Sequence, residues 1–115
     1  MNKVNKNFLN NSHYITDLKL CSIRLIDNSK FPWIILIPKR KKINDITELN
    51  TKDQFLLMRE IVLCGKIMKK VFKTSKLNVE KIDNKVPKLH IHIIARFKKD
   101  SSWLLPVWVV REKAY

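Results

Sequence analysis

The sequence predicts an α+β domain in which an antiparallel sheet of about five strands carries one long amphipathic helix and a short helical turn. Apolar residues recur at helical spacing over about twenty residues that begin near Thr51. Segments with alternating or β-branched side chains lie on both sides of this helix. The order of strands, helix and a final strand pair is typical of an antiparallel α+β domain.

The length of the chain and its low content of Gly and Pro predict a single domain. The 115 residues, about 13.7 kDa, suffice for one core, and one Gly and four Pro leave no flexible linker. We expect residues 1–115 to form one domain. Within it, the polar residues 1–11 should fray, and residues 100–115 should pack on the core or on a dimer partner.

The charge is high but does not select a partner. The chain has 24 Lys and Arg residues against 10 Asp and Glu, a formal net charge of +14, which is compatible with a nucleic-acid or membrane surface. Nineteen of the basic residues are Lys. Lys, Asn and Ile all have A/T-rich codons, so genomic composition can explain part of the charge.

The sequence also predicts a cytoplasmic protein with no membrane segment. The first residues contain no apolar run of signal-peptide length, and no stretch approaches the roughly 20 apolar residues of a membrane helix. Cys21 and Cys64 lie too far apart for a CxxC motif, so we expect reduced, buried thiols.

The first half of the chain predicts two strands and a turn. Leu18–Ile26 alternates in polarity as a strand does, and Asp27–Lys30 has the short polar side chains of a turn. Trp33–Ile37 is fully apolar, as expected for a strand that is covered on both faces, and Pro38 ends it.

The middle of the chain predicts the helical elements. Asn44–Leu49 fits a single helical turn, and Thr51–Gln54 fits a capping box at the start of the long helix. The apolar residues that we expect to face the sheet are Phe55, Met58, Ile61, Val62, Gly65, Met68 and Phe72.

A final strand pair carries the chemically informative residues. Leu77–Ile82 and Leu89–Phe97 are predicted strands joined by a tight turn at 83–85. Because strand side chains alternate, one face should carry Lys88, His90, His92 and Arg96, and the other Leu89, Ile91 and Ile93 against the helix.

Two imidazoles and two cations on one face suit an anion site with a nucleophile. Imidazole can attack phosphorus, a second imidazole can donate a proton to the leaving group, and cations stabilise the phosphate oxygens. Three alternatives stay open: polar decoration of an exposed face, a zinc-binding histidine pair, and ordinary solvated charges at Lys88 and Arg96. Neighbouring cations and the lack of a nearby third His or Cys disfavour zinc.

Three sequence blocks in this order resemble the histidine triad (HIT) family. They are residues 25–40, the His-x-His block 77–96, and the segment 100–108, which is similar to a Trp-x-x-Pro-Val-Trp tail. The resemblance runs from Phe8 to Trp108. More narrowly, it is to a bacterial branch of HIT-domain hydrolases resembling diadenosine tetraphosphate hydrolases.

The resemblance implies a HIT-like fold and a set of residue roles. His90 would be the nucleophile that accepts a nucleotidyl group, and His92 would bind the phosphate and assist the leaving group. Asn78 and Asn84 would contact the phosphate or support its loop, and Asp27 would hold the ribose hydroxyls. Three apolar residues would wall the base: Ile23, Leu25 and Phe31.

The resemblance also implies an activity. Proteins of this kind form homodimers and hydrolyse nucleoside phosphoramidates or dinucleoside polyphosphates, without a cofactor and without a metal in the chemical step. Lys88 and Arg96 would then bind the substrate phosphate. The alternative is a non-catalytic nucleotide-binding or nucleic-acid-binding protein with a degenerate triad.

Three positions depart from the family pattern. Lys88 occupies the first triad position, where most members have His and this branch often has Gln. Asp83 stands where a Gly is usual, and Leu104 where a Pro is expected.

His13, in the polar first segment, is expected to be a surface residue outside the site.

Overall fold

The protein is a five-stranded antiparallel sheet with one long helix packed on it, as predicted. The computed structural model describes residues 12–28, 30–82 and 87–98. The strand order is β1-β2-β3-β5-β4, and every neighbouring pair is antiparallel. The elements are β1 (Ser12–Asp17), β2 (Cys21–Ile26), β3 (Trp33–Pro38), η1 (Ile46–Glu48), α2 (Thr51–Phe72), β4 (Lys76–Glu80) and β5 (Ile91–Arg96).

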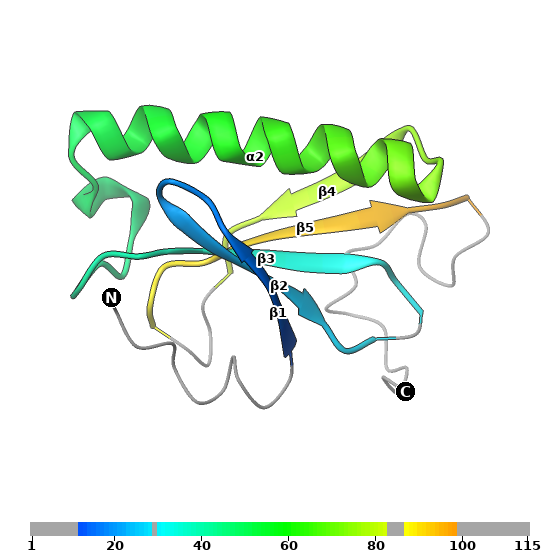
Figure 1. Cartoon of the computed structure of the whole chain (residues 1–115), viewed down its shortest axis with the longest axis horizontal. Helices are drawn as coiled ribbons and strands as arrows, with labels where there is room; N and C mark the ends of the chain where they lie inside the picture. The colour runs from blue at the N-terminus through cyan, green and yellow to red at the C-terminus, as the bar shows by residue number, and fades with distance from the viewer. Residues whose placement is uncertain (1–11, 29, 83–86, 99–115) are drawn as a thin grey trace.

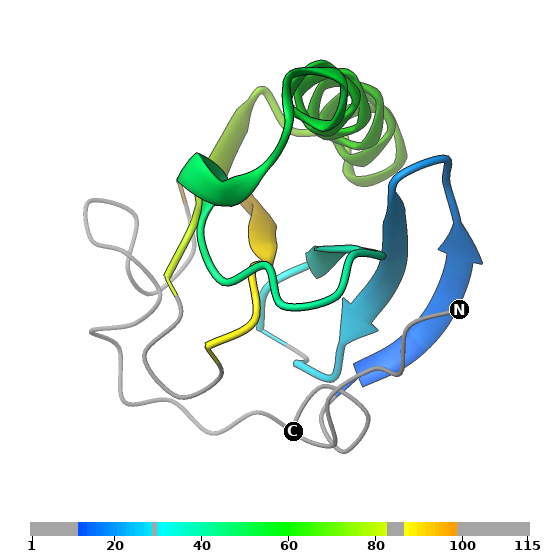
Figure 2. The same ribbon diagram turned by 90° about the vertical axis from the view of Figure 1, so that its left-hand side faces the viewer.

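Two layers make up the described structure. Helix α2 runs across one face of the sheet, and β5 lies between β3 and β4 beneath it (Figure 1). The view along the helix axis shows α2 on one side of the curved sheet only (Figure 2). Strand residues that alternate away from α2 place their side chains on the opposite face. The predicted frayed segment 1–11 and the segment 100–115 lie outside the described residues.

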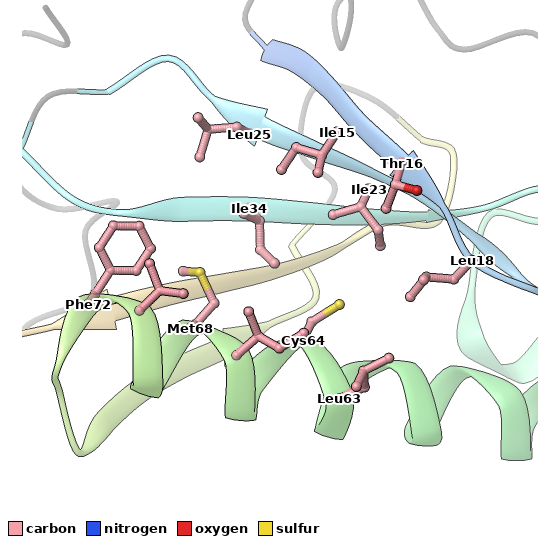
Figure 3. Close-up of a pocket in the computed structure, with 12 residues that line it drawn as sticks. Ile15, Thr16, Leu18, Ile23, Leu25, Ile34, Leu63, Cys64, Met68 and Phe72 are labelled. Atoms are coloured by element: carbon pink, nitrogen blue, oxygen red, sulfur yellow. The ribbon is translucent and has the colours of Figure 1, made fainter.

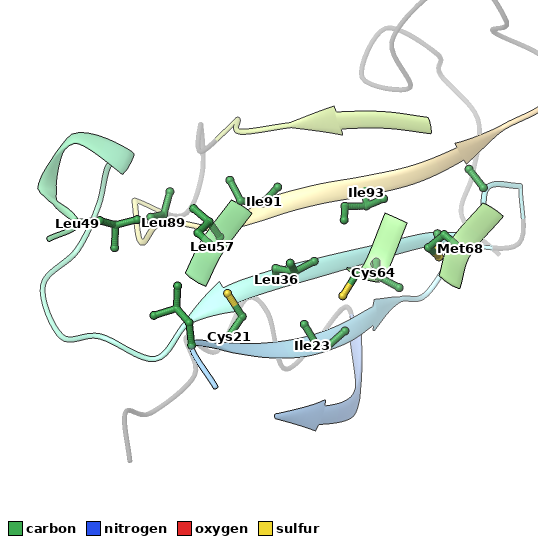
Figure 4. Packing of buried hydrophobic residues seen from close by; sticks show 13 residues of the cluster. Cys21, Ile23, Leu36, Leu49, Leu57, Cys64, Met68, Leu89, Ile91 and Ile93 are labelled. Atoms are coloured by element: carbon green, nitrogen blue, oxygen red, sulfur yellow. The ribbon is translucent and has the colours of Figure 1, made fainter. Parts of the chain in front are cut away.

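The core fills the space between α2 and the sheet. Leu57, Cys64 and Met68 of the helix lie over apolar residues of the three central strands, among them Leu36 and Ile93 (Figure 4). All of them are less than 10% exposed, and burial of such side chains is the main favourable contribution to folding.

The buried side of α2 agrees only in part with the predicted one. Gly65 and Met68 are buried and Ile61 packs against the core, as predicted. Phe55, Met58 and Val62 were also expected to face the sheet, but they are 71%, 59% and 43% exposed. Apolar residues occupy most of this helix's circumference, so their spacing alone does not select one face. The buried stripe includes two acidic residues, Asp53 and Glu60, that a purely apolar pattern cannot reveal.

The start of α2 is capped one residue earlier than predicted. The Asn50 side chain accepts a hydrogen bond from the Asp53 backbone N–H at 2.8 Å, so Asn50 and not Thr51 is the N-cap. The Gln54 side chain donates to the Leu49 carbonyl at 2.9 Å. The predicted helical turn is present as η1.

Strand β1 was not predicted as a strand, because its exposed residues conceal the alternation. It pairs with β2 and contains an irregularity between Tyr14 and Thr16. Strand β2 begins at Cys21 rather than at Leu18. Strands β4 and β5 are joined through residues 81–90, a longer connection than the predicted tight turn, whose residues 83–85 lie outside the described part.

A buried carboxylate joins α2 to the β1–β2 connection. Glu60, 6% exposed, accepts hydrogen bonds from the backbone N–H groups of Leu20 at 2.8 Å and Cys21 at 2.9 Å. The two cysteines are free and buried, as predicted. Burial raises the pKa of both thiols, that of Cys64 to about 11, so both are protonated at neutral pH.

Among the described helices, none has the length and apolar character needed to cross a bilayer.

We predict that Glu60→Ala lowers the free energy of unfolding by about 2 to 4 kcal/mol, because it leaves two buried N–H donors without their acceptor. Urea denaturation would measure the loss. The matched control is Glu48→Ala, which removes an exposed carboxylate that accepts one backbone bond, from Asn44. Equal effects of the two substitutions would contradict the stabilising role that we assign to the two hydrogen bonds of Glu60.

Candidate active site

Strand β5 sorts its side chains between the core and the opposite face, as predicted. Ile91, Ile93 and Ala95 lie in the core under α2. The alternate residues His92 and Arg96 lie on the face away from the helix. Opposite His92, on that same face, stand Ile35 of β3 and Glu80 of β4.

His90 immediately precedes β5 and is held by the backbone of Lys88. Its ring Nδ1 lies 2.7 Å from the Lys88 carbonyl oxygen, and the residue is 5% exposed. A carbonyl only accepts hydrogen bonds, so Nδ1 carries the proton and Nε2 carries the lone pair. This arrangement suits a nucleophilic imidazole.

His92 lies next to His90 in an environment that disfavours its charged form. The two rings meet edge to face, with centroids 4.9 Å apart. The Trp33 indole N–H donates a hydrogen bond to Nδ1 of His92 at 2.9 Å. Burial, and then the neighbouring His90, lower the pKa of His92 to about 4, against a smaller opposing effect of the Ile82 backbone. His92 is therefore neutral at pH 7.

Lys88, the predicted phosphate-binding cation at the first triad position, is anchored to a loop. Its ammonium donates a hydrogen bond to the Arg40 carbonyl at 2.6 Å, and burial lowers its pKa. The Arg40 guanidinium in turn binds both carboxylate oxygens of Asp53, at 2.7 and 2.9 Å. Lys88 thus connects the segment that carries His90 to the start of α2.

Arg96 shares the face of His92 but not its immediate neighbourhood. It is 2% exposed, and its guanidinium lies over the Phe31 ring, 5.3 Å from the centroid. Four residues of extended strand separate it from His92 by about 13 Å. The structure therefore does not group Arg96 with the two histidines in the way that the strand pattern suggested.

A hollow of about 360 Å³ contains most of the predicted nucleoside residues. Asp27 follows β2 and is exposed there, and Leu25 and Phe31 line the same hollow. Ile23, the third predicted base-wall residue, lies in the core instead, 4% exposed. The remaining lining residues are His13, Ile26, Asn28, Pro32 and Phe72.

The two predicted asparagines have different outcomes. Asn78 of β4 pairs with Ile94 and lies on the same face as Glu80 and His92, half-buried. Asn84 lies outside the described residues. In the part of the chain that the structure describes, no three His, Cys, Asp or Glu residues gather as a metal site.

Sequence reasoning missed three residues of this region. His13 is a surface residue, as expected, with a side chain that is 70% exposed, but it also lines the hollow, with Nε2 4.0 Å from the Asp27 carboxylate. Trp33 was interpreted only as part of an apolar strand. A buried indole N–H requires a hydrogen-bond acceptor, so a Trp in a covered strand could have indicated a polar partner nearby. Glu80 gave no signal, because its place opposite His92 depends on strand register.

A second hollow, between α2 and the β1–β2 hairpin, is lined by apolar side chains such as Ile15, Leu63 and Met68 (Figure 3). It offers no charged group to a phosphate. The polar face of the sheet is therefore the better candidate for the active site.

Comparison with known proteins relates the chain to histidine triad proteins. The sequence profile of the HIT domain matches residues 7–99. Histidine triad proteins from Sinorhizobium meliloti and Bradyrhizobium japonicum are each 34% identical to the chain, with TM-scores of 0.94 and 0.93. A histidine triad protein from Marinobacter aquaeolei is 30% identical, with a TM-score of 0.93. Each similarity covers 98% of this chain, and respectively 83%, 85% and 82% of those chains.

No curated protein matches the chain. A five-stranded sheet with an adjacent His-x-His pair on the face opposite its helix defines a histidine triad architecture. The chain belongs to the HIT domain family, whose members are typically nucleotide hydrolases or transferases.

The low pKa of His92 predicts a loss of stability in acid. The folded-state pKa, about 4, lies below the ordinary value of 6.5, so the unfolded chain takes up the proton first. The contribution of His92 is therefore complete above about pH 6.5 and falls as the pH drops towards 4. Between pH 7 and pH 5, His92 therefore lowers the free energy of unfolding by about 2 kcal/mol.

Urea denaturation of the native chain and of His92→Gln at both pH values would measure this contribution. The difference between pH 7 and pH 5 should be smaller in the variant by that amount. Parallel stability profiles would contradict the low pKa.

Proposed function

We propose that the protein is a nucleotidyl hydrolase or transferase that acts through a covalent nucleotidyl-histidine intermediate on His90. The observation that carries the proposal is the contact of His90 Nδ1 with the Lys88 carbonyl, 2.7 Å away, beside a second and neutral imidazole. This contact directs the proton to Nδ1 and the lone pair to Nε2. In its neutral form, His90 thus presents the Nε2 lone pair for attack.

In the first step, the Nε2 lone pair of His90 forms a bond to the α-phosphorus of a nucleotide. The bond from phosphorus to the leaving nitrogen or oxygen breaks, and its electron pair leaves with that group, which takes up a proton from solvent. The ring becomes positively charged, and the Lys88 carbonyl at Nδ1–H stabilises this charge. Water then attacks phosphorus and releases a proton to solvent, the P–N bond to His90 breaks with its electron pair returning to Nε2, and the nucleoside monophosphate leaves.

The remaining residues are assigned roles on the same basis. His92 would donate a hydrogen bond to the phosphate or to the leaving group, Asn78 and Asn84 would support the phosphate, and Asp27 would bind the ribose in the hollow beside Phe31. The ammonium of Lys88 is bound to the Arg40 carbonyl, so its support of the phosphate would act mainly through its charge. Arg96 would contribute to the field of the same face.

The substrate class proposed is a nucleoside phosphoramidate or a dinucleoside polyphosphate, as in the diadenosine tetraphosphate hydrolase-like branch. Both present an α-phosphorus with a leaving group to a nucleophile. We propose that the reaction takes place in the cytoplasm and needs no cofactor and no metal in the chemical step.

We predict that His90→Ala abolishes the release of AMP from adenosine phosphoramidate or diadenosine tetraphosphate, with a loss of at least about 1,000-fold, because the nucleophile is removed. Chromatography of the products would measure the rate. Lys66→Ala, which truncates an exposed side chain of α2, serves as the control and should retain activity. Turnover that persists in His90→Ala would contradict the mechanism.

If the native chain turns over neither substrate and instead binds RNA with an affinity that falls steeply with salt, it is a binding protein, and the proposed activity is wrong.

We also propose that the protein forms a homodimer through the β4 side of the molecule. Strand β4 is the outermost strand of the described sheet on that side. Gly65 of α2 faces it, since a Cβ at Gly65 would lie 3.1 Å from Leu77 Cδ1. Met58 and Val62, seven and three residues before Gly65, share this flank of the helix.

The flank is apolar and exposed. Met58 and Val62 are 59% and 43% exposed, and Val79 on β4 is 49% exposed. A strand at the edge of the described sheet, beside exposed apolar side chains, favours pairing with another chain, and a second copy would satisfy both features at once.

We predict that Met58→Glu weakens this dimer at least tenfold, because it places a charge in an apolar interface. Light scattering over a dilution series would measure the change. The matched control is Ile67→Glu, which alters an equally exposed residue on the other flank of α2, where Ile67 lines the second hollow. The proposal fails if Ile67→Glu dissociates the protein and Met58→Glu does not.

A further inference from the structure

Trp33 donates a hydrogen bond to Nδ1 of His92, and the chemistry of the indole N–H fixes the direction of this bond. Trp33 lies on β3, where it pairs with Ile94, two residues beyond His92 in β5. The indole Nε1 lies 2.9 Å from Nδ1 of His92, and the two rings meet edge to face with centroids 5.7 Å apart. An indole N–H can only donate.

This direction determines which nitrogen of His92 carries the proton. Nδ1 accepts the bond from Trp33, so the neutral ring bears its proton on Nε2. His90 has the reverse arrangement, because its Nδ1 faces the Lys88 carbonyl, which can only accept. The two imidazoles are thus held in opposite tautomers by a donor-only and an acceptor-only partner.

We propose that Trp33 is a positioning residue that fixes His92 as the neutral Nε2–H tautomer, so that His92 serves as a hydrogen-bond donor beside the His90 nucleophile. This inference rests on the proposed function and names the residue that separates the roles of the two histidines.

The charges around His92 determine what the fixed tautomer contributes. Among the described residues, the titratable groups that face it are His90 from the segment before β5 and Glu80 from β4, whereas β3 presents the uncharged Ile35 and Trp33. If Nδ1 of His92 took up a proton, its N–H would point at the Trp33 indole N–H across 2.9 Å, and the hydrogen bond from Trp33 would be lost. The lowered pKa of His92 agrees with this cost.

A neutral donor is useful because His90 becomes cationic when phosphorus is attached. With the ring centroids 4.9 Å apart, a second imidazolium would repel the intermediate. A neutral Nε2–H group can hydrogen-bond a phosphoryl oxygen without that repulsion. Trp33 therefore lowers the energy of the charged intermediate by keeping its neighbour uncharged.

The test is nitrogen-15 NMR of the labelled full chain at pH 7, which reports the tautomer of each imidazole. The chain contains three histidines, and His90→Gln and His92→Gln assign their signals. In the native chain we expect the Nε2–H form for His92 and the Nδ1–H form for His90. In Trp33→Phe, which keeps an aromatic ring without the donor, we expect His92 to populate the Nδ1–H form as well.

Kinetics separate this role from a merely structural one. Trp33→Phe should lower kcat about tenfold or more with a smaller change in KM, the size of loss that follows removal of a ring-orienting partner in metal-bound histidines. The acid limb of the pH–rate profile should move towards higher pH.

The matched control is Ile35→Val. Ile35 is buried on β3, the strand of Trp33, and lies directly opposite His92. This substitution should leave the tautomer and kcat unchanged.

Two outcomes overturn the inference whatever the activity: an Nδ1–H form of His92 in the native chain, or an unchanged tautomer in Trp33→Phe. The native spectrum alone decides the first, even if the variant does not fold. By contrast, a native chain that shows the expected tautomers but turns over no nucleotide refutes the proposed function and not the assignment of Trp33.

Discussion

The register of β5 is the constraint on which the site depends. Ile91, Ile93 and Ala95 must lie under α2, and this requirement alone places His92 on the other face. A slip of one residue would exchange the two sets and would bury imidazole in the apolar core, a costly arrangement without a partner. The same apolar residues that stabilise the domain therefore also fix the histidines.

The sequence was sufficient for the architecture but not for every boundary. Strand β3 and helix α2 were predicted closely, because a long apolar run and a long helical period are strong local signals. Strand β1 was missed, since its partner and not its own pattern makes it a strand. The buried side of α2 was misassigned at Phe55 because the deciding residue, Glu60, is charged and acquires its partners only in the folded chain.

For the site, residue type and alternation identified His90 and His92, but not how each is held. Which nitrogen bears the proton depends on Lys88 and Trp33, and the Trp33 contact joins residues 59 positions apart. The anchoring of Lys88 to the Arg40 carbonyl was equally invisible, because a lysine beside two histidines suggests an anion. Pairings of this kind depend on the meeting of β3, β5 and the loop that follows β3.

Whether His90 carries a nucleotidyl group is tested most directly by trapping it. The native chain would be mixed briefly with diadenosine tetraphosphate or adenosine phosphoramidate and quenched in alkali, where phosphorus–nitrogen bonds on histidine survive, and its peptides would be analysed by mass spectrometry. We expect one AMP group attached to His90. Attachment to His92, or substrate turnover with no adduct at any quench time, would contradict it.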